Sequence, residues 1–295
     1  MLKVTKGCMM NNMIFQYLVV NDNVDKRGDI KGRKRSELYL EMADISRRSF
    51  EKYASEIGCD YMYSDERVFT KDHECSTSTL YECLRVVYDP YFDQFDKVLF
   101  ADTDIVVNTK ESIFDISDAE VYGVLESDIR TEDKGGYNAW DYDKKVYENY
   151  VEKHSMHDCP IIPSFGIGKN FDSKITIFNT GVVVWTKEAR LKARELFDSW
   201  EEWLDPKRFL DPNAKMHHMS ILNDQPFISA QLMKHDFDVE SVDQKWNDTP
   251  THYQDPQHWI DTGKSYFLHY TGGDQKAEMV DLYHKGKFPI FNEGW

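Results

Sequence analysis

Short apolar runs alternate with longer segments of helical periodicity over the first 107 residues, and this alternation constrains the fold more than any other feature of the sequence. The apolar runs cover residues 13–20, 59–63, 97–100 and 105–107, and the helical periodicity covers residues 36–57 and 79–88. Strands and helices that alternate along a chain form sheets with helices packed on their faces. The sequence therefore predicts an α/β fold, and its first half is typical of a nucleotide-binding sheet.

The boundaries of these segments follow from local signals. Ser36 is expected to cap the helix over residues 36–57, and Gly58 is expected to end it. The helix over residues 79–88 should end before Pro90, because a residue that precedes proline disfavours helical geometry.

The second half of the chain is less regular. An apolar run covers residues 175–185 with an interruption at 179–181, a helix is expected over residues 187–204, and further strands are expected at 237–242 and 266–269. Residues 131–170 show no clear period, so we expect an insertion or an acceptor-binding loop there.

Length and composition favour one globular domain. The chain has 295 residues, and no linker rich in proline, glycine or serine divides it. We expect a single domain with two halves, about residues 13–110 for binding the nucleotide sugar and about 111–295 for binding the acceptor and the donor sugar. The formal net charge of −16 would repel nucleic acid and anionic membranes, so neither is an expected partner.

The cysteines and the N-terminal apolar stretch bear on location. Five cysteines at irregular spacings, without a CxxC pair, suggest neither a disulfide framework nor a zinc site. The stretch over residues 9–20 contains polar side chains and is too short to span a membrane, and no cleavage signature follows it. We therefore expect a protein without a membrane span in a reducing compartment such as the cytoplasm.

Two carboxylates interrupt one of the apolar strands. Residues 97–107 read as a buried strand broken at Ala101-Asp102-Thr103-Asp104. The polar interruption of an apolar run indicates a bend at this place, and we expect the bend to bring Asp102 and Asp104 to one site. Buried carboxylates need a cation or a basic partner, because desolvation disfavours their charge. A divalent cation would satisfy both.

Residues 96–107 resemble the hallmark segment of glycosyltransferase family 8, the glycogenin-like and lipopolysaccharide galactosyltransferase-like enzymes. The resemblance implies a GT-A fold, a Rossmann-like mixed sheet flanked by helices. It also implies that Asp102 and Asp104 hold a divalent cation, Mn²⁺ or Mg²⁺, against the diphosphate of a nucleotide-sugar donor. Arg85, seventeen residues before Asp102, matches the position of the arginine that contacts the donor in that family.

Two further segments are similar to those of the same family. Residues 177–183 resemble its sugar-pocket segment, which implies donor contacts from Asn179 and Gly181. Asn223-Asp224-Gln225 resembles its Asp-Gln pair, in which the carboxylate binds sugar hydroxyls and the amide lies below the anomeric carbon. Read without the resemblance, this second triplet is a helix cap.

The last similar segment covers residues 267–272. It implies that His269 is the third protein ligand of the metal and that Gly272 approaches the diphosphate. Lys276 matches the phosphate-binding lysine of the family, one residue later than the family pattern places it. Without the resemblance, His269 is a buried structural histidine and Arg85 a surface arginine on a helix.

These expectations together predict a metal-dependent glycosyltransferase that moves a hexose or pentose from a nucleoside diphosphate sugar, with uridine as the favoured base, to a glycan or glycoprotein acceptor. The family resemblance implies retention of anomeric configuration. Two alternatives stay open at this point, a sugar nucleotidyltransferase and a catalytically silent carbohydrate-binding module. The first would need a glycine-rich phosphate loop after the first strand, where the chain has Asn21-Asp22-Asn23-Val24.

Overall fold

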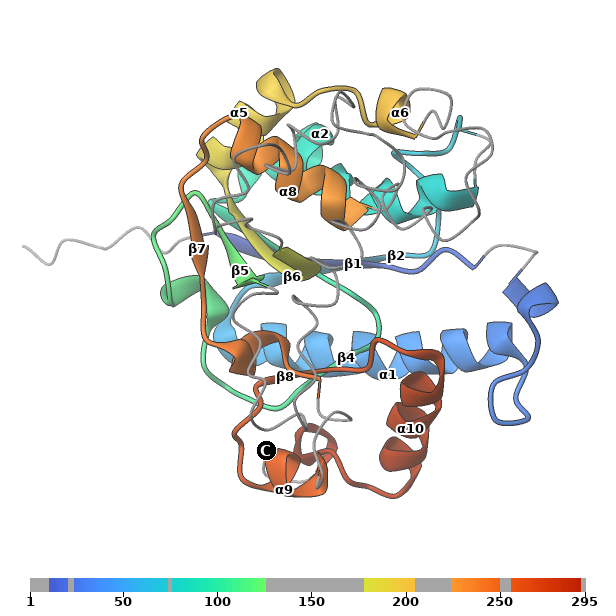
Figure 1. The fold of residues 1–295 in the computed structure, drawn as a ribbon. Coiled ribbons are helices and arrows are strands. Elements are labelled where there is room, and N and C mark those ends of the chain that lie inside the picture. Colours follow the sequence, from blue (N-terminus) through green and yellow to red (C-terminus); the bar gives the residue numbers. More distant parts are fainter. Residues whose placement is uncertain are drawn as a thin grey trace, which may run out of the picture.

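A computed structural model describes residues 11–20, 24–73, 76–125, 178–204, 224–249 and 256–292 of the chain. Its centre is a mixed sheet of six strands in the order β2-β1-β3-β6-β5-β7 (Figure 1). The strands of this sheet are β1 (Asn12–Tyr17), β2 (Asp60–Ser64), β3 (Lys97–Ala101), β5 (Val121–Leu125), β6 (Phe178–Thr186) and β7 (Val239–Ser241). A second sheet pairs β4 (Ile105–Val107) with β8 (Phe267–His269).

Helices cover both faces of the large sheet, as Figure 1 shows. The described α-helices are α1 (Arg35–Ile57), α2 (Arg85–Tyr88), α5 (Lys187–Leu196), α6 (Trp200–Trp203), α8 (Asp224–Lys234), α9 (Pro256–Asp261) and α10 (Gly273–His284). In that view α1, α9 and α10 lie below the sheet with β4 and β8, and α2, α5, α6 and α8 lie above it. The predicted α/β fold, a mixed sheet flanked by helices, is confirmed.

Alternate residues of the central strands belong to two different hydrophobic clusters, one on each face of the large sheet. Phe15, Phe100 and Trp185 belong to the cluster under α5, α6 and α8. Their neighbours Ile14, Leu99 and Val184 belong to the cluster under α1 and α10. Successive strand residues point to opposite faces, so a sheet covered on both sides needs apolar residues at nearly every position. This explains why the central strands are continuous apolar runs.

The start of α1 differs from the prediction. Lys34 occupies the N-cap position without a side-chain cap. Ser36 lies inside the first turn, where its backbone N–H and its hydroxyl both donate to the carboxylate of Asp25, each at 2.8 Å. Asp25, in the 3₁₀ segment Val24–Arg27, therefore supplies the acceptor that we expected from Ser36. The end of the helix was predicted correctly, because Gly58 has the left-handed conformation (φ 70°).

The helix expected over residues 187–204 is interrupted. It ends at Leu196, and α6 begins at Trp200. The hydroxyl of Ser199 caps α6 by accepting a hydrogen bond from the N–H of Glu202. Phe197 has extended backbone because its ring packs against Trp185 and other aromatic rings of the core. Tertiary packing therefore overrides the helical periodicity at this point.

The structure also differs from the prediction in the type of helix over residues 79–88. Most of the segment expected as a helix over residues 79–88 belongs to a 3₁₀ helix, Ser76–Leu84, and only Arg85–Tyr88 is α-helical. The polar residues 179–181 that interrupt the apolar run lie within β6 (Phe178–Thr186), and the pairing of β6 with β5 shifts register at this place, between Gly123 and Leu125. The whole of the predicted insertion at 131–170, like its neighbours from 126 to 177, lies outside the described residues.

The connections of the sheet fix where a ligand site can lie. β1 pairs in parallel with β2 on one side and with β3 on the other. The connection after β1 therefore leads to one side of it, and the connection after β2 leads back to the other side. Such a point of divergence leaves a crevice at the carboxyl ends of the strands. Asp102 follows β3 at this edge. None of the helices in the described ranges combines the length and hydrophobicity needed to cross a membrane.

Candidate functional site

The chain bends between β3 and β4 and passes from the large sheet to the small one. The N–H of Asp102 donates to the carbonyl of Gly181 at 2.8 Å, which keeps Asp102 on the large sheet. The N–H of Tyr270 donates to the carbonyl of Asp104 at 2.9 Å, which ties Asp104 to the end of β8. The bend predicted from the polar interruption is therefore present.

A buried glutamine holds the same bend from the side of β1. Gln16 donates from Nε2 to the carbonyl of Asp102 at 2.8 Å and to the hydroxyl of Ser46 at 3.0 Å. Its Oε1 accepts from the hydroxyl of Tyr61 at 2.8 Å. Gln16 has no exposed surface, and buried polar groups are retained in cores when they are hydrogen-bonded. Sequence analysis missed this role, although a lone amide within an apolar strand was a signal for it.

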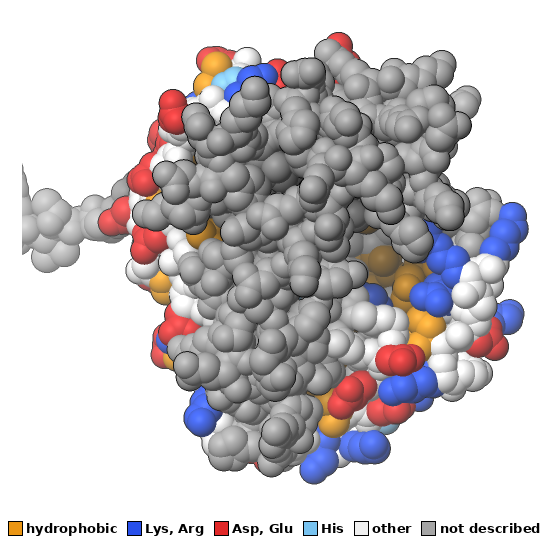
Figure 2. Space-filling view, in the orientation of Figure 1, with side chains coloured by type: hydrophobic (Ala, Val, Ile, Leu, Met, Phe, Trp, Pro, Cys, Tyr) orange, Lys and Arg blue, Asp and Glu red, His pale blue; other side chains and the backbone are white. Residues whose placement is uncertain are grey.

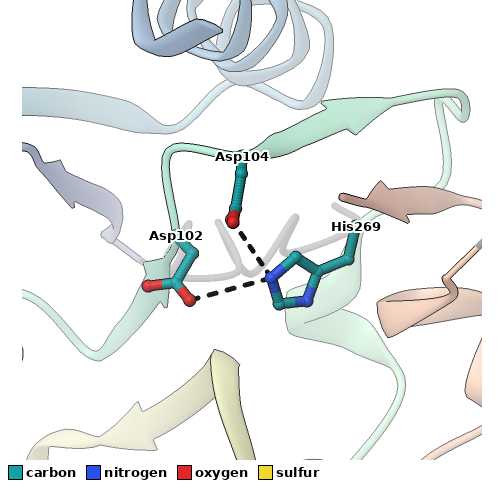
Figure 3. A group of neighbouring side chains, drawn as sticks. All are labelled: Asp102, Asp104 and His269. Carbon is teal, nitrogen blue, oxygen red and sulfur yellow. Dashed lines mark ion pairs between the residues drawn. The ribbon is translucent and has the colours of Figure 1, made fainter. Parts of the chain in front are cut away.

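Asp102, Asp104 and His269 meet at the end of the bend (Figure 3). Nε2 of His269 lies 3.1 Å from Oδ1 of Asp104 and 3.8 Å from Oδ2 of Asp102. One potential ligand atom from each residue lies within 4.8 Å of the others. Figure 3 shows both carboxylates directed at the same ring nitrogen. Two carboxylates and an imidazole are a ligand set that suits Mn²⁺.

The charges of this group shift the pKa of each of its three members. Burial raises the pKa of Asp104, but the charges of Lys276 and His269 outweigh it and hold that pKa below its usual range. Burial and the Asp104 carboxylate raise the pKa of Asp102, whose side chain is still 43% exposed. Burial opposes protonation of His269, and the two carboxylates overcome it and raise the pKa of the imidazole.

One atom of the group is left unsatisfied by the protein. Oδ1 of Asp104 is buried, and Nε2 of His269, 3.1 Å away, gives it a hydrogen bond only when that nitrogen carries a hydrogen; the other described residues give it none. Its other oxygen, Oδ2, forms an ion pair with the ammonium of Lys276. A buried carboxylate oxygen without a donor is costly, and a divalent cation between Asp104, Asp102 and His269 would satisfy it. The residues present therefore fit a metal ion.

A glycine makes room for the imidazole ring. A Cβ at position 181 would lie 2.4 Å from Cε1 of His269 and 3.0 Å from its Nδ1. The predicted donor residue Gly181 thus contacts the metal-ligand candidate directly. The side chain of Asn179 turns toward the same place, where its Oδ1 accepts from the N–H of Gly181 at 3.1 Å and from Nδ2 of Asn247 at 2.9 Å.

A cavity of about 200 Å³ opens beside Asp102 and Asp104. Figure 2 shows a recess on the right, near the start of α1, with hydrophobic side chains at its base and Lys and Arg side chains on its border. The residues that line the cavity include Tyr17, Val19, Tyr39, Thr79, Leu80 and Lys276. Aromatic walls, carboxylates and an ammonium group thus surround one space.

Asp224 is the first residue of α8, and its carboxylate faces back toward the sheet. Its Oδ2 accepts from the hydroxyl of Thr180 at 2.8 Å and from the thiol of Cys83 at 3.7 Å. Burial raises the pKa of Asp224, and its charge also contributes to the raised pKa of Asp102. The two carboxylates therefore belong to one electrostatic site. Gln225 follows in the first turn of α8.

The remaining predicted residues, Arg85 and Gly272, have hydrogen-bond partners outside the group of Asp102, Asp104 and His269. Arg85 begins α2, where its guanidinium pairs with Asp89 at 2.9 Å and stacks over the ring of Phe15. Gly272 is the N-cap of α10, and its N–H donates to Oε1 of Gln275 at 2.9 Å. Within the described residues, therefore, Lys276 forms an ion pair with Asp104, whereas Arg85 pairs with Asp89.

Residues 10–277 match the family described as Glycosyl transferase family 8. No match is found among curated proteins.

Several solved structures are similar to this chain. A glycosyltransferase involved in the glycosylation of the major capsid of PBCV-1 has 13% sequence identity and a TM-score of 0.48, over 93% of this chain and 99% of that one. Galactosyltransferase LgtC in complex with donor and acceptor sugar analogues has 13% identity and a TM-score of 0.40, over 96% and 98%. Mouse xyloside xylosyltransferase 1 has 13% identity and a TM-score of 0.36, over 89% and 97%.

Proposed function

This chain belongs to glycosyltransferase family 8, and from that membership we propose that it transfers a hexose or pentose from a uridine diphosphate sugar to a hydroxyl group of a glycan or glycoprotein. We further propose that the reaction depends on Mn²⁺ or Mg²⁺ and retains the configuration of the anomeric carbon. The group formed by Asp102, Asp104 and His269, beside a cavity at the point where the strands diverge, is the observation that carries this proposal.

Transfer requires stabilisation of the charge that develops on the leaving diphosphate when the bond to the anomeric carbon breaks. A divalent cation held by Asp102, Asp104 and His269 would supply positive charge at that place. Lys276 forms an ion pair with Asp104 and lines the cavity. In our proposal its ammonium group faces the diphosphate when the donor is bound, because preorganised charge lowers the cost of the transition state.

The cavity is suited to the nucleoside. Tyr17 and Val19, at the end of β1, and Tyr39 on α1 form its apolar walls. An aromatic ring can stack on a base without distinguishing one pyrimidine from another. Uridine is therefore proposed on the family resemblance, and the cavity supports only a flat, partly apolar group next to the carboxylates.

The donor sugar is assigned to the space beside Asp102 and Asp224. Asp224 shares an electrostatic site with Asp102, and Gln225 and Asn179 lie on the elements beside it. We propose that the Asp224 carboxylate accepts hydrogen bonds from sugar hydroxyls and that Gln225 lies below the anomeric carbon. Arg85 and Gly272 complete the proposed donor contacts, Arg85 after exchange of its partner Asp89 for the donor.

The two halves of the chain divide the work in this proposal. Residues from about 13 to 110 contribute the nucleotide cavity and two metal ligands, and residues from about 111 to 295 contribute His269 and the sugar contacts. The acceptor is assigned to the second half, whose predicted loop at 131–170 lies outside the described residues.

Hydrolysis of the donor tests this proposal without knowledge of the acceptor. A panel of nucleotide sugars is incubated with the protein in Mn²⁺ or in excess chelator, and release of the nucleoside diphosphate is measured. We expect release from a uridine diphosphate sugar in Mn²⁺ only. Asp104→Asn should abolish release without unfolding the protein, because the amide keeps the shape but loses the ligand charge. Equal turnover in chelator, or turnover by the Asp104→Asn variant, would remove the metal from the mechanism.

A further inference from the structure

The metal-facing nitrogen of His269 is determined by a partner on the other side of the ring. Nδ1 of His269 lies 2.7 Å from Oδ1 of Asn247, while Nε2 faces the two carboxylates. A carbonyl-type oxygen only accepts, so this contact requires a hydrogen on Nδ1. In the neutral ring Nε2 then carries the lone pair, which is the form that binds a metal.

The orientation of the Asn247 amide is itself fixed by the backbone. The N–H of Gly181 can only donate, so the atom of Asn179 that faces it at 3.1 Å must be Oδ1. That same oxygen lies 2.9 Å from the Asn247 side chain, and the carbonyl of Asn179 lies 3.4 Å from it. Two acceptors on this side require Nδ2 of Asn247 here, which leaves its Oδ1 for the ring.

The segment that carries Asn247 is clamped to β8. The N–H of Asp248 donates to the carbonyl of Phe267 at 2.9 Å, and the N–H of His269 donates to the carbonyl of Asp248 at 2.6 Å. The neighbouring Trp246 ring is buried against Phe267, at 5.3 Å between ring centroids. Asn247 is 4% exposed. The amide therefore has little freedom to turn or to be replaced by water.

We propose that Asn247 is a positioning residue that sets the tautomer and the orientation of His269 for metal binding, and that Asn179 and the N–H of Gly181 fix its amide for this purpose. The inference rests on the proposed function, since it assumes that His269 is a metal ligand. A relay of four groups then runs from the backbone of β6 to the metal-facing nitrogen. Partners of this kind affect metal affinity by roughly 10- to 100-fold in other proteins.

The proposed role of Asn247 also bears on a glycosylation pattern in the sequence. Asn247-Asp248-Thr249 fits the acceptor pattern for N-glycosylation. The Asn247 amide is buried and engaged at both ends, so it is not accessible to a modifying enzyme in the folded protein. In our proposal Asn247 serves the metal site and not glycosylation.

Mn²⁺ affinity of two variants tests the relay. Asn247→Leu keeps the approximate volume and removes the acceptor, whereas Asn247→Asp keeps an acceptor for Nδ1 but places a carboxylate oxygen against Oδ1 of Asn179. Calorimetry with Mn²⁺ in the presence of uridine diphosphate should show a dissociation constant at least about 10-fold higher for Asn247→Leu. The loss for Asn247→Asp should be smaller. The reverse order, or no loss for Asn247→Leu, would overturn the proposal.

A double-mutant cycle separates positioning from a general structural effect. If Asn247 acts through the imidazole, Asn247→Leu should have no further effect on Mn²⁺ affinity once His269→Ala has removed the ring. Pulsed electron paramagnetic resonance of bound Mn²⁺ gives a second readout, because imidazole coordination couples the metal to nitrogen. We expect this nitrogen signal in the wild type, its loss in His269→Ala, and its weakening in Asn247→Leu. Additive losses in the cycle would mean that Asn247 acts elsewhere.

The outcomes distinguish this inference from the proposed function. A wild-type protein that binds no Mn²⁺, with or without uridine diphosphate, would overturn the proposed function and this inference with it. A wild type that binds Mn²⁺ with a nitrogen signal unchanged in Asn247→Leu would overturn only the inference. If thermal unfolding shows that Asn247→Leu does not fold, Asn179→Ala takes its place. That change frees the Asn247 amide to turn, and it should weaken both Mn²⁺ binding and the nitrogen signal.

Discussion

Replacement of Gly181 by alanine should displace the imidazole of His269 and thereby damage the metal site from the neighbouring strand. The added Cβ would lie 2.4 Å from Cε1 of His269, whereas carbon atoms pack at about 3.5 Å. The ring would have to retreat by about 1 Å. It cannot rotate freely, because Nδ1 is hydrogen-bonded to Asn247 and the backbone of His269 pairs with Asp248 and Ile105.

The expected size of the effect follows from that displacement. A misplacement of about 1 Å in a catalytic constellation costs roughly 100-fold in rate, and a shifted ligand should weaken Mn²⁺ binding by roughly 10-fold or more. Overpacking of a core position by one methyl group costs about 1 to 3 kcal/mol of unfolding free energy. Gly181→Ala should therefore remain folded and lose metal affinity and turnover.

Gly58→Ala is the matched control. Gly58 ends α1 in the left-handed conformation (φ 70°), and nothing lies within 4 Å of the position that its Cβ would take. Alanine in that conformation costs roughly 1 to 2 kcal/mol, so both variants should lose comparable unfolding free energy. Only Gly181→Ala should lose Mn²⁺ affinity in calorimetry and turnover in the donor-hydrolysis assay.

The reasoning fails if the two variants behave alike. Wild-type Mn²⁺ affinity in a folded Gly181→Ala protein would mean that the ring accommodates the methyl group without leaving the site. Equal loss of affinity in Gly58→Ala would mean that general destabilisation, and not the contact between Gly181 and His269, weakens the metal site.

Three further expectations concern acidity, donor binding and the core. Because burial and Asp104 raise the pKa of Asp102 to about 7, protons should compete with Mn²⁺, and affinity in calorimetry should rise from about pH 5 to about pH 8; a constant affinity would contradict this. The same raised pKa means that Asp102 stabilises the metal-free fold below about pH 4 and that this contribution is lost as the pH rises through 7. Asp224→Asn should preserve stability, since asparagine caps helices as well as aspartate does, but it should weaken binding of the intact nucleotide sugar more than binding of the free nucleotide. Gln225→Ala should lower turnover with little change in donor affinity. Wild-type donor affinity and turnover in Asp224→Asn would leave only the capping role for Asp224. Arg190→Met should lower the unfolding free energy by about 3 kcal/mol or more in chemical denaturation, because the buried guanidinium donates to three carbonyls that would lose their donor, while Mn²⁺ affinity stays unchanged.

The elements that the sequence predicted well are those whose pattern reflects burial alone. The central strands are apolar at almost every position because both faces of the sheet are covered, and this pattern is visible without the partners. Gly58 marked the end of α1 because the left-handed conformation is rarely available to other residues. The polar interruption at 101–104 indicated a bend, since carboxylates are not buried in a regular strand without a reason.

The errors arose where a distant residue decides the local structure. Ser36 has the side chain of a helix cap, yet Asp25 occupies the acceptor position because the preceding 3₁₀ turn brings its carboxylate there. Residues 187–204 have helical spacing, yet Phe197 leaves the helix to pack with aromatic rings from β6, from α8 and from the loop before β7. Neither partner can be identified from the local sequence, so the prediction stops at the boundary of the element.

The candidate site shows the same division at the level of chemistry. The residue types of the proposed metal site, Asp102, Asp104 and His269, are visible in the sequence because few structural roles require them together. What prepares the imidazole is not visible, since Asn247 precedes His269 by 22 residues and contacts it only because the segment before β8 pairs with that strand. An amide has two ends of opposite character, and its orientation here depends on a backbone N–H of β6. The ligands of such a site are therefore a property of the sequence, whereas the tautomer that makes one of them a ligand is a property of the fold.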